Sequence, residues 1–166
     1  MRYLAGTREL RLIMKGDLGP GKPLEIVAYS DADFAADKED MKSITGGLVT
    51  VDGMSISWTC KKQGGVSLST MEAECAAASV MTREILGVRE LVRELGVAYV
   101  MPMPLRVDNQ SALKQLEGEC ASVKAKHVGV KIKFVGDYTS KGVLKPEYRE
   151  SEYMPADLMT KPLAAP

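Results

Sequence analysis

Cysteine and histidine are scarce in this 166-residue chain, which restricts the chemistry it can perform. The three cysteines, Cys60, Cys75 and Cys120, are an odd number with no CxxC spacing, and His127 is the only histidine. A disulfide framework and a Cys/His zinc site are therefore both excluded. A reducing compartment suits such a chain best.

Long apolar runs and an excess of charge are also missing. No apolar run reaches the roughly 18 residues that span a bilayer, and the first six residues lack the hydrophobic region of a secretory signal. We therefore expect a soluble intracellular protein without a membrane partner, or an excerpt of one. The 22 basic and 22 acidic residues give zero net charge, so the total does not imply general attraction to nucleic acid.

The basic residues are nevertheless unevenly distributed. Residues 124–145 contain a single acid, Asp137, and six lysines: Lys124, Lys126, Lys131, Lys133, Lys141 and Lys145. Such a segment can form a phosphate-binding face, for which Lys131 and Lys133 are our candidates. A solvated lysine-rich helix face would give the same pattern, and charge alone favours that interpretation.

The 45% hydrophobic content and the length predict one domain with its own core. Alternating apolar runs predict strands at residues 24–30, 46–51, 54–59, 105–107 and 143–148. The first of these strands is expected to end at Asp31, and Asp52-Gly53 predicts a tight turn between the second and third. A hairpin meander followed by helical crossovers indicates an α/β fold with a mixed sheet.

Capping signals place the helices. Ser69 and Glu72 have the spacing of a capping box, so a long helix should begin there and run to Leu95, ahead of Gly96. A second helix should begin after Asp108 or Asn109 and end near Gly118. A third should cover residues 126–138, and Pro155 should open a short final helix.

Four acidic residues stand out by position. Asp31 and Asp108 each follow a short apolar strand, where open α/β sheets place their sites, although a lone Asp there is usually a turn residue. Glu74 lies four residues before a helical stripe, so it is expected to face inward; Glu72 lies about 200° around the helix and caps it. The stripe comprises Ala78, Met81, Ile85, Val88, Val92 and Leu95. A half-exposed glutamate near the helix N-terminus is the alternative for Glu74.

Asp157 follows Pro155 at the start of the last helix, where an acid can serve the helix dipole alone. Together the four acids form a set of hard oxygen ligands, which suits Mg²⁺ or Mn²⁺ rather than zinc. Two such ions about 4 Å apart are a known device for in-line displacement at phosphate.

Seven sequence blocks carry a resemblance to a known family. They are, in order, Tyr29-Ser30-Asp31-Ala32-Asp33-Phe34-Ala35, Lys42-Ser43-Ile44-Thr45-Gly46-Gly47, Ile56-Ser57-Trp58, Leu68-Ser69-Thr70-Met71-Glu72-Ala73-Glu74, Asp108-Asn109-Gln110-Ser111-Ala112, Lys126-His127 and Ala156-Asp157-Leu158-Met159-Thr160-Lys161-Pro162-Leu163. Over nearly its whole length the chain resembles the ribonuclease H domain that ends the reverse transcriptase of copia-type LTR retrotransposon Pol polyproteins. The resemblance implies a connecting segment at residues 1–15 and the ribonuclease H domain at residues 16–166.

The resemblance also implies a fold and a site. The fold would be α/β and ribonuclease-H-like, with a mixed five-stranded sheet and helices on both faces. The catalytic residues and metal ligands would be Asp31, Glu74, Asp108 and Asp157, which hold two Mg²⁺ ions, or Mn²⁺ in their place. The residues beside these acids, Ser69, Thr70, Asn109 and Gln110, would contact the sugar-phosphate backbone of an RNA–DNA hybrid.

The implied function is a metal-dependent endonuclease that hydrolyses the RNA strand of RNA–DNA hybrids during reverse transcription. The polymerase domain of the same polyprotein would be its partner, and the cytoplasmic virus-like particle of the element its location. The first alternative is a catalytically inactive or co-opted module that binds nucleic acid or assists assembly; the second is an integrase-like nuclease of the same fold. The four intact acids favour the enzyme.

The chain departs from the family pattern at several positions. Phe34 stands where the family usually has Trp, Cys75 where it usually has Tyr, and Gly129 where an acid is common. Cellular ribonucleases H carry a histidine before the last acid that assists product release, and residues 150–155 contain none. His127 lies 30 residues before Asp157 and is not assigned to that task.

Overall fold

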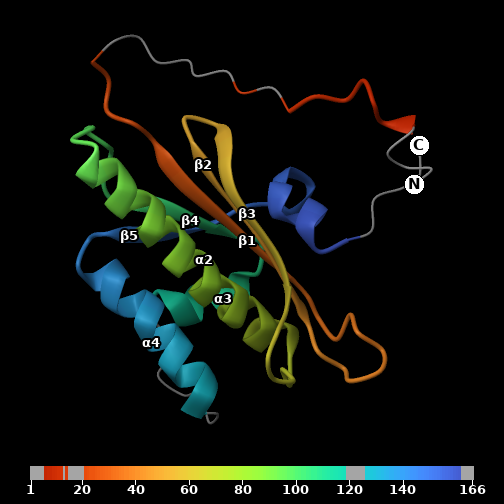
Figure 1. Cartoon of the computed structure of the whole chain (residues 1–166). Helices are drawn as coiled ribbons and strands as arrows, with labels where there is room; N and C mark the ends of the chain where they lie inside the picture. The colour runs from red at the N-terminus through yellow and green to blue at the C-terminus, as the bar shows by residue number, and fades with distance from the viewer. Residues whose placement is uncertain (1–5, 13, 15–20, 119–125, 162–166) are drawn as a thin grey trace.

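A computed structural model describes residues 6–12, 14, 21–118 and 126–161, and within these ranges five strands form one sheet (Figure 1). The strand order is β3-β2-β1-β4-β5; β1 pairs antiparallel with β2 and parallel with β4, β2 pairs antiparallel with β3, and β4 pairs parallel with β5. The strands are β1 (Ile26–Asp33), β2 (Ile44–Val51), β3 (Met54–Lys62), β4 (Met103–Val107) and β5 (Leu144–Tyr148). The mixed five-stranded sheet confirms the predicted fold class.

The helices begin where the sequence signals them. They are α2 (Thr70–Glu94), α3 (Gln110–Leu116), α4 (Lys126–Ser140) and the 3-10 helices η1 (Ser151–Tyr153) and η2 (Pro155–Met159). Ser69 Oγ accepts a hydrogen bond of 3.2 Å from the Glu72 amide, and Gly96 has a φ of +69° just beyond α2. Half of the capping-box prediction is wrong, because the Glu72 carboxylate accepts from the Leu68 amide at 2.8 Å and not from that of Ser69.

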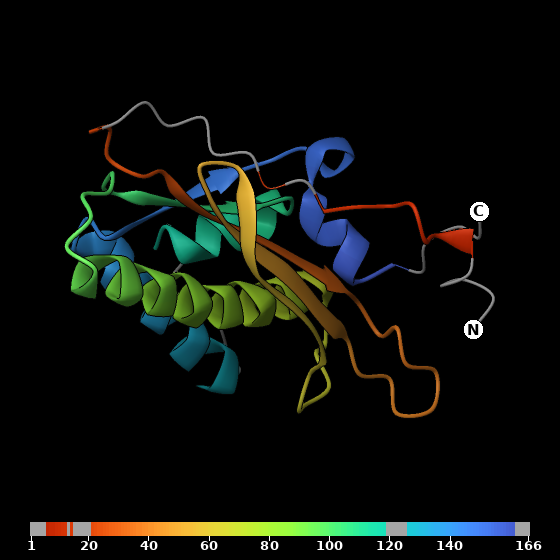
Figure 2. The same cartoon turned by 45° about the horizontal axis from the view of Figure 1, so that its top comes forward.

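Two adjacent glycines of β2 show how the two faces of the sheet are covered. A Cβ on Gly47 would collide with the Met81 side chain of α2, whereas a Cβ on Gly46 would lie 2.9 Å from the Ala156 carbonyl oxygen of η2. Because successive strand residues point to opposite faces, α2 and η2 lie on opposite sides of the sheet. Figure 2 shows the same arrangement, with α2 and α4 below the sheet and the C-terminal 3-10 helices above it. Helices therefore cover both faces, as predicted.

The predicted stripe of α2 forms the core against the sheet. Ala78, Met81 and Ile85 are fully buried, and they pack with residues such as Val49 and Leu105 of the strands. Leu95 was expected to continue this stripe but is 69% exposed. The reason is that α2 ends at Glu94, so Leu95 is its C-cap residue and lies beyond the regular helix that carries the stripe.

One predicted strand end also differs. β1 does not stop at Asp31 but continues to Asp33, because its ladder with β2 pairs Asp31 with Gly46 and Asp33 with Ile44. The predicted short helix that Pro155 opens is present and is a 3-10 helix. The predicted turn is confirmed: Asp52 and Gly53 have φ of 48° and 76°.

Some predictions fall on residues that the structure does not describe. These are the domain boundary between residues 15 and 16, Cys120, Lys124 and the side chains of Lys126 and His127. They stay predictions. Among the helices in the described ranges, none is both long enough and apolar enough to cross a membrane.

Candidate metal centre

The parallel pairing of β1 and β4 brings two aspartates together. Ser30 is paired with Val107, the last pair of the β1–β4 ladder, so the next residues, Asp31 and Asp108, emerge side by side where this ladder ends. Asp31 is only 3% exposed, while Asp108 is half-buried. Their common edge is where sites of α/β sheets form.

Glu74 joins them from the first turns of α2. Its side chain is 3% exposed, and its Oε1 accepts a hydrogen bond of 3.2 Å from the Ala32 amide of β1. The expectation that Glu74 faces inward is therefore confirmed. One carboxylate oxygen from each of Asp31, Glu74 and Asp108 lies within 4.8 Å of the other two.

Asp157, on η2, lies beside this group of three but does not belong to it. One of its oxygens is held in an ion pair with Lys161, and the other, Oδ1, is buried and lacks a hydrogen-bond partner among the described residues. Its charge still acts on the group, because it contributes to raising the pKa values of both Asp31 and Glu74. The role of Asp157 as a ligand remains a prediction.

The pKa values of Glu74 and Asp31 are raised when no cation is present. Burial, followed by the charges of Asp108 and Asp31, raises the pKa of Glu74 to about 9. Burial also raises the pKa of Asp31, against the opposing effect of its hydrogen bond from Thr160. A divalent cation would replace the proton and remove the repulsion.

Two hydroxyl groups orient the carboxylates. Thr160, which follows η2, donates through Oγ1 to Asp31 Oδ2, and Ser151 of η1 donates to Asp108 Oδ2 at 2.8 Å. Neither role was predicted from the sequence. Thr160 lies in one of the seven blocks that carry the resemblance, so a signal existed for it, but nothing in the sequence distinguishes Ser151 from an ordinary loop serine.

The donor set fits hard divalent cations. Every candidate ligand atom is a carboxylate oxygen, the kind that Mg²⁺ and Mn²⁺ prefer. Glu74 Oε2 is buried and, like Asp157 Oδ1, has no hydrogen-bond partner within the described ranges. Buried oxygens without partners are costly, and a bound cation would satisfy them.

The predicted substrate contacts lie at the helix starts beside these acids. Ser69 and Asn109 use their side-chain oxygens as caps of α2 and α3, the latter accepting from the Ala112 amide at 2.9 Å. Thr70 and Gln110, the first residues of these helices, are exposed. Their contact with substrate is not tested by the geometry and stays a prediction.

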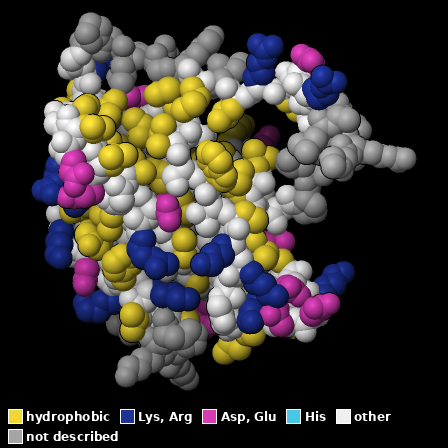
Figure 3. All heavy atoms as spheres, viewed as in Figure 1, with side chains coloured by type: hydrophobic (Ala, Val, Ile, Leu, Met, Phe, Trp, Pro, Cys, Tyr) yellow, Lys and Arg dark blue, Asp and Glu magenta, His cyan; other side chains and the backbone are white. Residues whose placement is uncertain are grey.

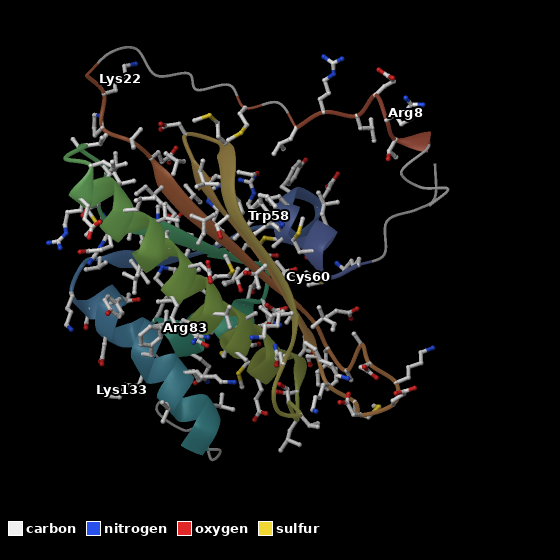
Figure 4. The ribbon with its side chains drawn as sticks, viewed as in Figure 1. Arg8, Lys22, Trp58, Cys60, Arg83 and Lys133 are labelled. Atoms are coloured by element: carbon white, nitrogen blue, oxygen red, sulfur yellow. The ribbon has the colours of Figure 1, made fainter. Side chains whose placement is uncertain are left out.

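Lys131 and Lys133, which the basic segment predicts as contacts of the same phosphate-binding face, lie in different places in the structure. Lys131 is half-buried and lines a groove with α2 and β3. Lys133 is exposed, binds Asp137 at 3.0 Å and lines a different hollow with α3. In Figure 4, Lys133 is labelled at the outer side of α4 and Arg83 over α2.

Several known proteins are similar to this chain in sequence. No protein-family model matches it. The Retrovirus-related Pol polyprotein from transposon RE1 of Arabidopsis thaliana is 33% identical over 164 residues, which is 99% of this chain and 11% of the polyprotein. Pol polyproteins of copia-type transposons are therefore among the homologues of this chain. The chain spans only about a tenth of their length.

Solved structures identify the fold. The N-terminal RNase H domain of Rv2228c from Mycobacterium tuberculosis matches with a TM-score of 0.60 at 13% identity, over 82% of this chain and 91% of that one. LC11-RNase H1 in complex with an RNA/DNA hybrid matches with a TM-score of 0.57 at 18% identity, over 81% and 93%. The chain therefore has the ribonuclease H fold, as the sequence resemblance implied.

Proposed function

We propose that this chain is a ribonuclease H that hydrolyses the RNA strand of RNA–DNA hybrids within a transposon reverse transcriptase. The observation that carries the proposal is the cluster of Asp31, Glu74 and Asp108, whose oxygens meet within 4.8 Å at the edge of a ribonuclease H fold. Homology to Pol polyproteins and likeness to a structure with a bound hybrid support the same substrate.

Asp31, Glu74 and Asp108, joined by Asp157, would hold two Mg²⁺ or Mn²⁺ ions. When bound, such ions supply the charge stabilisation that in-line displacement at phosphorus requires. Through their hydrogen bonds, Thr160 and Ser151 would keep the carboxylates of Asp31 and Asp108 oriented toward the ions. Ser69, Thr70, Asn109 and Gln110 would hold the sugar-phosphate backbone beside it.

In the reaction, the oxygen of a water molecule attacks the RNA phosphorus and the bond from phosphorus to the ribose 3′ oxygen breaks. The products are a 5′-phosphate and a 3′-hydroxyl, and the leaving oxygen takes up a proton. Selectivity for RNA would come from the 2′-hydroxyls and the groove shape of the hybrid rather than from base contacts. In the same proposal, the domain acts in the cytoplasmic particle of its element, beside the polymerase domain.

The test is hydrolysis of a labelled hybrid by the purified full chain in Mg²⁺, in Mn²⁺ and in chelator. We expect cleavage of the RNA strand with either ion, none in chelator, and none of the DNA strand or of duplex DNA. If the folded chain binds the hybrid but cleaves it with neither ion, the inactive binding module is the correct reading and the enzyme is not.

A further inference from the structure

A groove of about 470 Å³ lies between the end of β3, α2 and α4, and four cations line it. They are Lys61 and Lys62 of β3, Arg83 of α2 and Lys131 of α4. Glu84 is the one carboxylate among the lining residues. Figure 3 shows dark-blue side chains gathered over the middle of α2 on this face. Neither the three clustered acids nor Asp157 beside them lines the groove, so the two sites are separate.

Three of the four cations are not neutralised. Lys62 binds Asp37 at 2.5 Å and Asp40 at 2.9 Å. For Lys61, Arg83 and Lys131, the described part of the chain offers no carboxylate within 4.0 Å. The groove thus concentrates positive charge in a chain whose net charge is zero. Such a surface attracts polyanions.

Along the axis of α2, the groove begins close to the metal centre, but on the opposite side of the helix. Ala76, Ser79 and Arg83 line it from successive turns of α2, and Ala76 is two residues beyond Glu74. Nine residues of α-helix separate Glu74 from Arg83, which is about 13 Å along the helix and about 180° around it. At about 3.4 Å of rise per nucleotide, the axial distance alone corresponds to roughly four nucleotides of a duplex, so a strand bound at both sites spans at least that many.

We propose that this groove binds the backbone phosphates of a nucleic-acid strand, through Lys61, Arg83 and Lys131, at least about four nucleotides from the phosphodiester at the metal centre. The proposal rests on the proposed function and extends the substrate path beyond it. The lining residues include no aromatic side chain for base stacking, so binding here depends on phosphate charge and not on sequence.

The decisive measurement is the salt dependence of hybrid binding. The full chain carries Asp108→Asn to prevent cleavage, and a labelled hybrid of about 20 base pairs is titrated at several salt concentrations between roughly 25 and 200 mM. Arg83→Gln with Lys131→Gln should weaken binding about tenfold or more at the lowest salt. The slope of log K against log salt should become shallower by about 2, since each lost phosphate contact removes about 0.9.

A matched control removes the same two charges elsewhere. Lys22→Gln with Arg93→Gln changes one lysine and one arginine, both exposed; Lys22 lies near the start of β1 and Arg93 at the far end of α2, bound to Glu90. This double variant should keep the parent's affinity and slope. Equal weakening by both double variants would show a general charge effect and overturn the groove.

Two further arms separate the ligand sources and the two proposals. In the first, millimolar tripolyphosphate is added to the hybrid titrations. If the parent still binds hybrid but no longer binds it more tightly than the Arg83 and Lys131 double variant, the groove is a site for small anions, and backbone binding is overturned. If the wild-type chain cleaves hybrid but the groove variant binds it with an unchanged salt slope, the proposal for the groove is overturned and the proposed function stands. If the chain binds with the expected slopes but does not cleave, the proposed function fails and the groove stands.

Substrate length gives an independent readout. With cleavage-competent protein, the groove variant should raise the KM for long hybrids. It should leave the KM unchanged for hybrids trimmed to about three base pairs on both sides of the cleaved bond, because these do not reach Arg83. An equal rise of KM for both lengths would contradict the proposed path.

Discussion

The metal centre and the basic groove both use residues of α2, but they differ in how their like charges are accommodated. At the start of α2, Glu74 meets Asp31 and Asp108 in a site where two of the three carboxylates are almost fully buried. Further along the same helix, Arg83 shares a groove with Lys61, and both are exposed. Exposed cations repel weakly because water screens them, whereas buried carboxylates must take up protons or bind a cation.

This difference predicts how each region responds to substitution. The carboxylate centre is held by specific hydrogen bonds from Ala32, Thr160 and Ser151, so losing one ligand should remove a function altogether. Three of the four cations of the groove have no carboxylate partner among the described residues, so losing one of them should give a graded change in binding. The following predictions test this contrast.

The largest effect is expected for Asp108→Asn, which should reduce hydrolysis at least about 100-fold in Mg²⁺. The amide keeps the shape and can still accept the hydrogen bond from Ser151, so the melting temperature should stay close to that of the parent. Activity and thermal unfolding are measured on the same preparations. Parental turnover at equal metal concentration would remove Asp108 from the metal centre.

The second prediction concerns pH and metal together. The pKa of Glu74 in the folded chain is raised to about 9 from an ordinary 4.5 by burial and by Asp108 and Asp31. The protonated acid therefore contributes stability that is fully present below about pH 4.5 and is lost as the pH rises toward 9. In chelator, the melting temperature should fall between pH 5.5 and 8.5, and Glu74→Gln should flatten this fall.

Added Mn²⁺ or Mg²⁺ should oppose this fall of the melting temperature with pH. Because the cations bind deprotonated carboxylates, the stabilisation by metal should grow with pH over the same interval. Glu72→Gln is the control, since Glu72 contacts only the Leu68 amide at the helix start and should leave both pH dependences in place. A wild-type melting temperature that is independent of both pH and Mn²⁺ would contradict a preformed site.

An intermediate effect is expected at Thr160, whose hydroxyl donates to buried Asp31. Thr160→Val keeps the shape but removes the donor, which should destabilise the fold by about 1 to 3 kcal/mol and weaken Mn²⁺ binding about tenfold. Thr160→Ser keeps the donor and should retain most of both properties. Thermal unfolding and a Mn²⁺ titration compare the two variants; identical behaviour of Val and Ser would show that the hydrogen bond does not position Asp31.

The same contrast explains what the sequence could predict. Asp31, Glu74 and Asp108 were singled out by local signals, namely expected strand ends and a helical stripe, which depend on residues near each of them, although β1 continues past Asp31 to Asp33. The assignment of the acids as metal ligands, which stays a prediction, and the resemblance to the family came from the motif blocks. Both kinds of signal can be read from the sequence without knowing how the chain packs.

The groove could not be predicted in this way, because it joins positions far apart in the chain. Lys61, Arg83 and Lys131 come from a strand and two helices, and only the packing of α2 between β3 and α4 brings them together. The basic segment did indicate Lys131, but it paired it with Lys133, which lies two residues on and therefore about 200° around α4. Likewise, Ser151 reaches Asp108 across 43 residues of sequence.

The smallest effect we predict distinguishes neighbouring lysines at the end of β3. Lys61 has no carboxylate partner among the described residues, whereas Lys62 is held by Asp37 and Asp40, which also raise its pKa. Lys61→Gln should therefore make the salt dependence of hybrid binding shallower by about 1. Lys62→Gln should change the salt dependence less, because the charge of Lys62 is already largely compensated and its binding releases fewer counterions.

Both variants carry Asp108→Asn and are compared in the same anisotropy titration. A larger effect at Lys62 than at Lys61 would mean that the phosphates displace Asp37 and Asp40, and that ion pairing in the free chain does not decide which cations of the groove bind the strand.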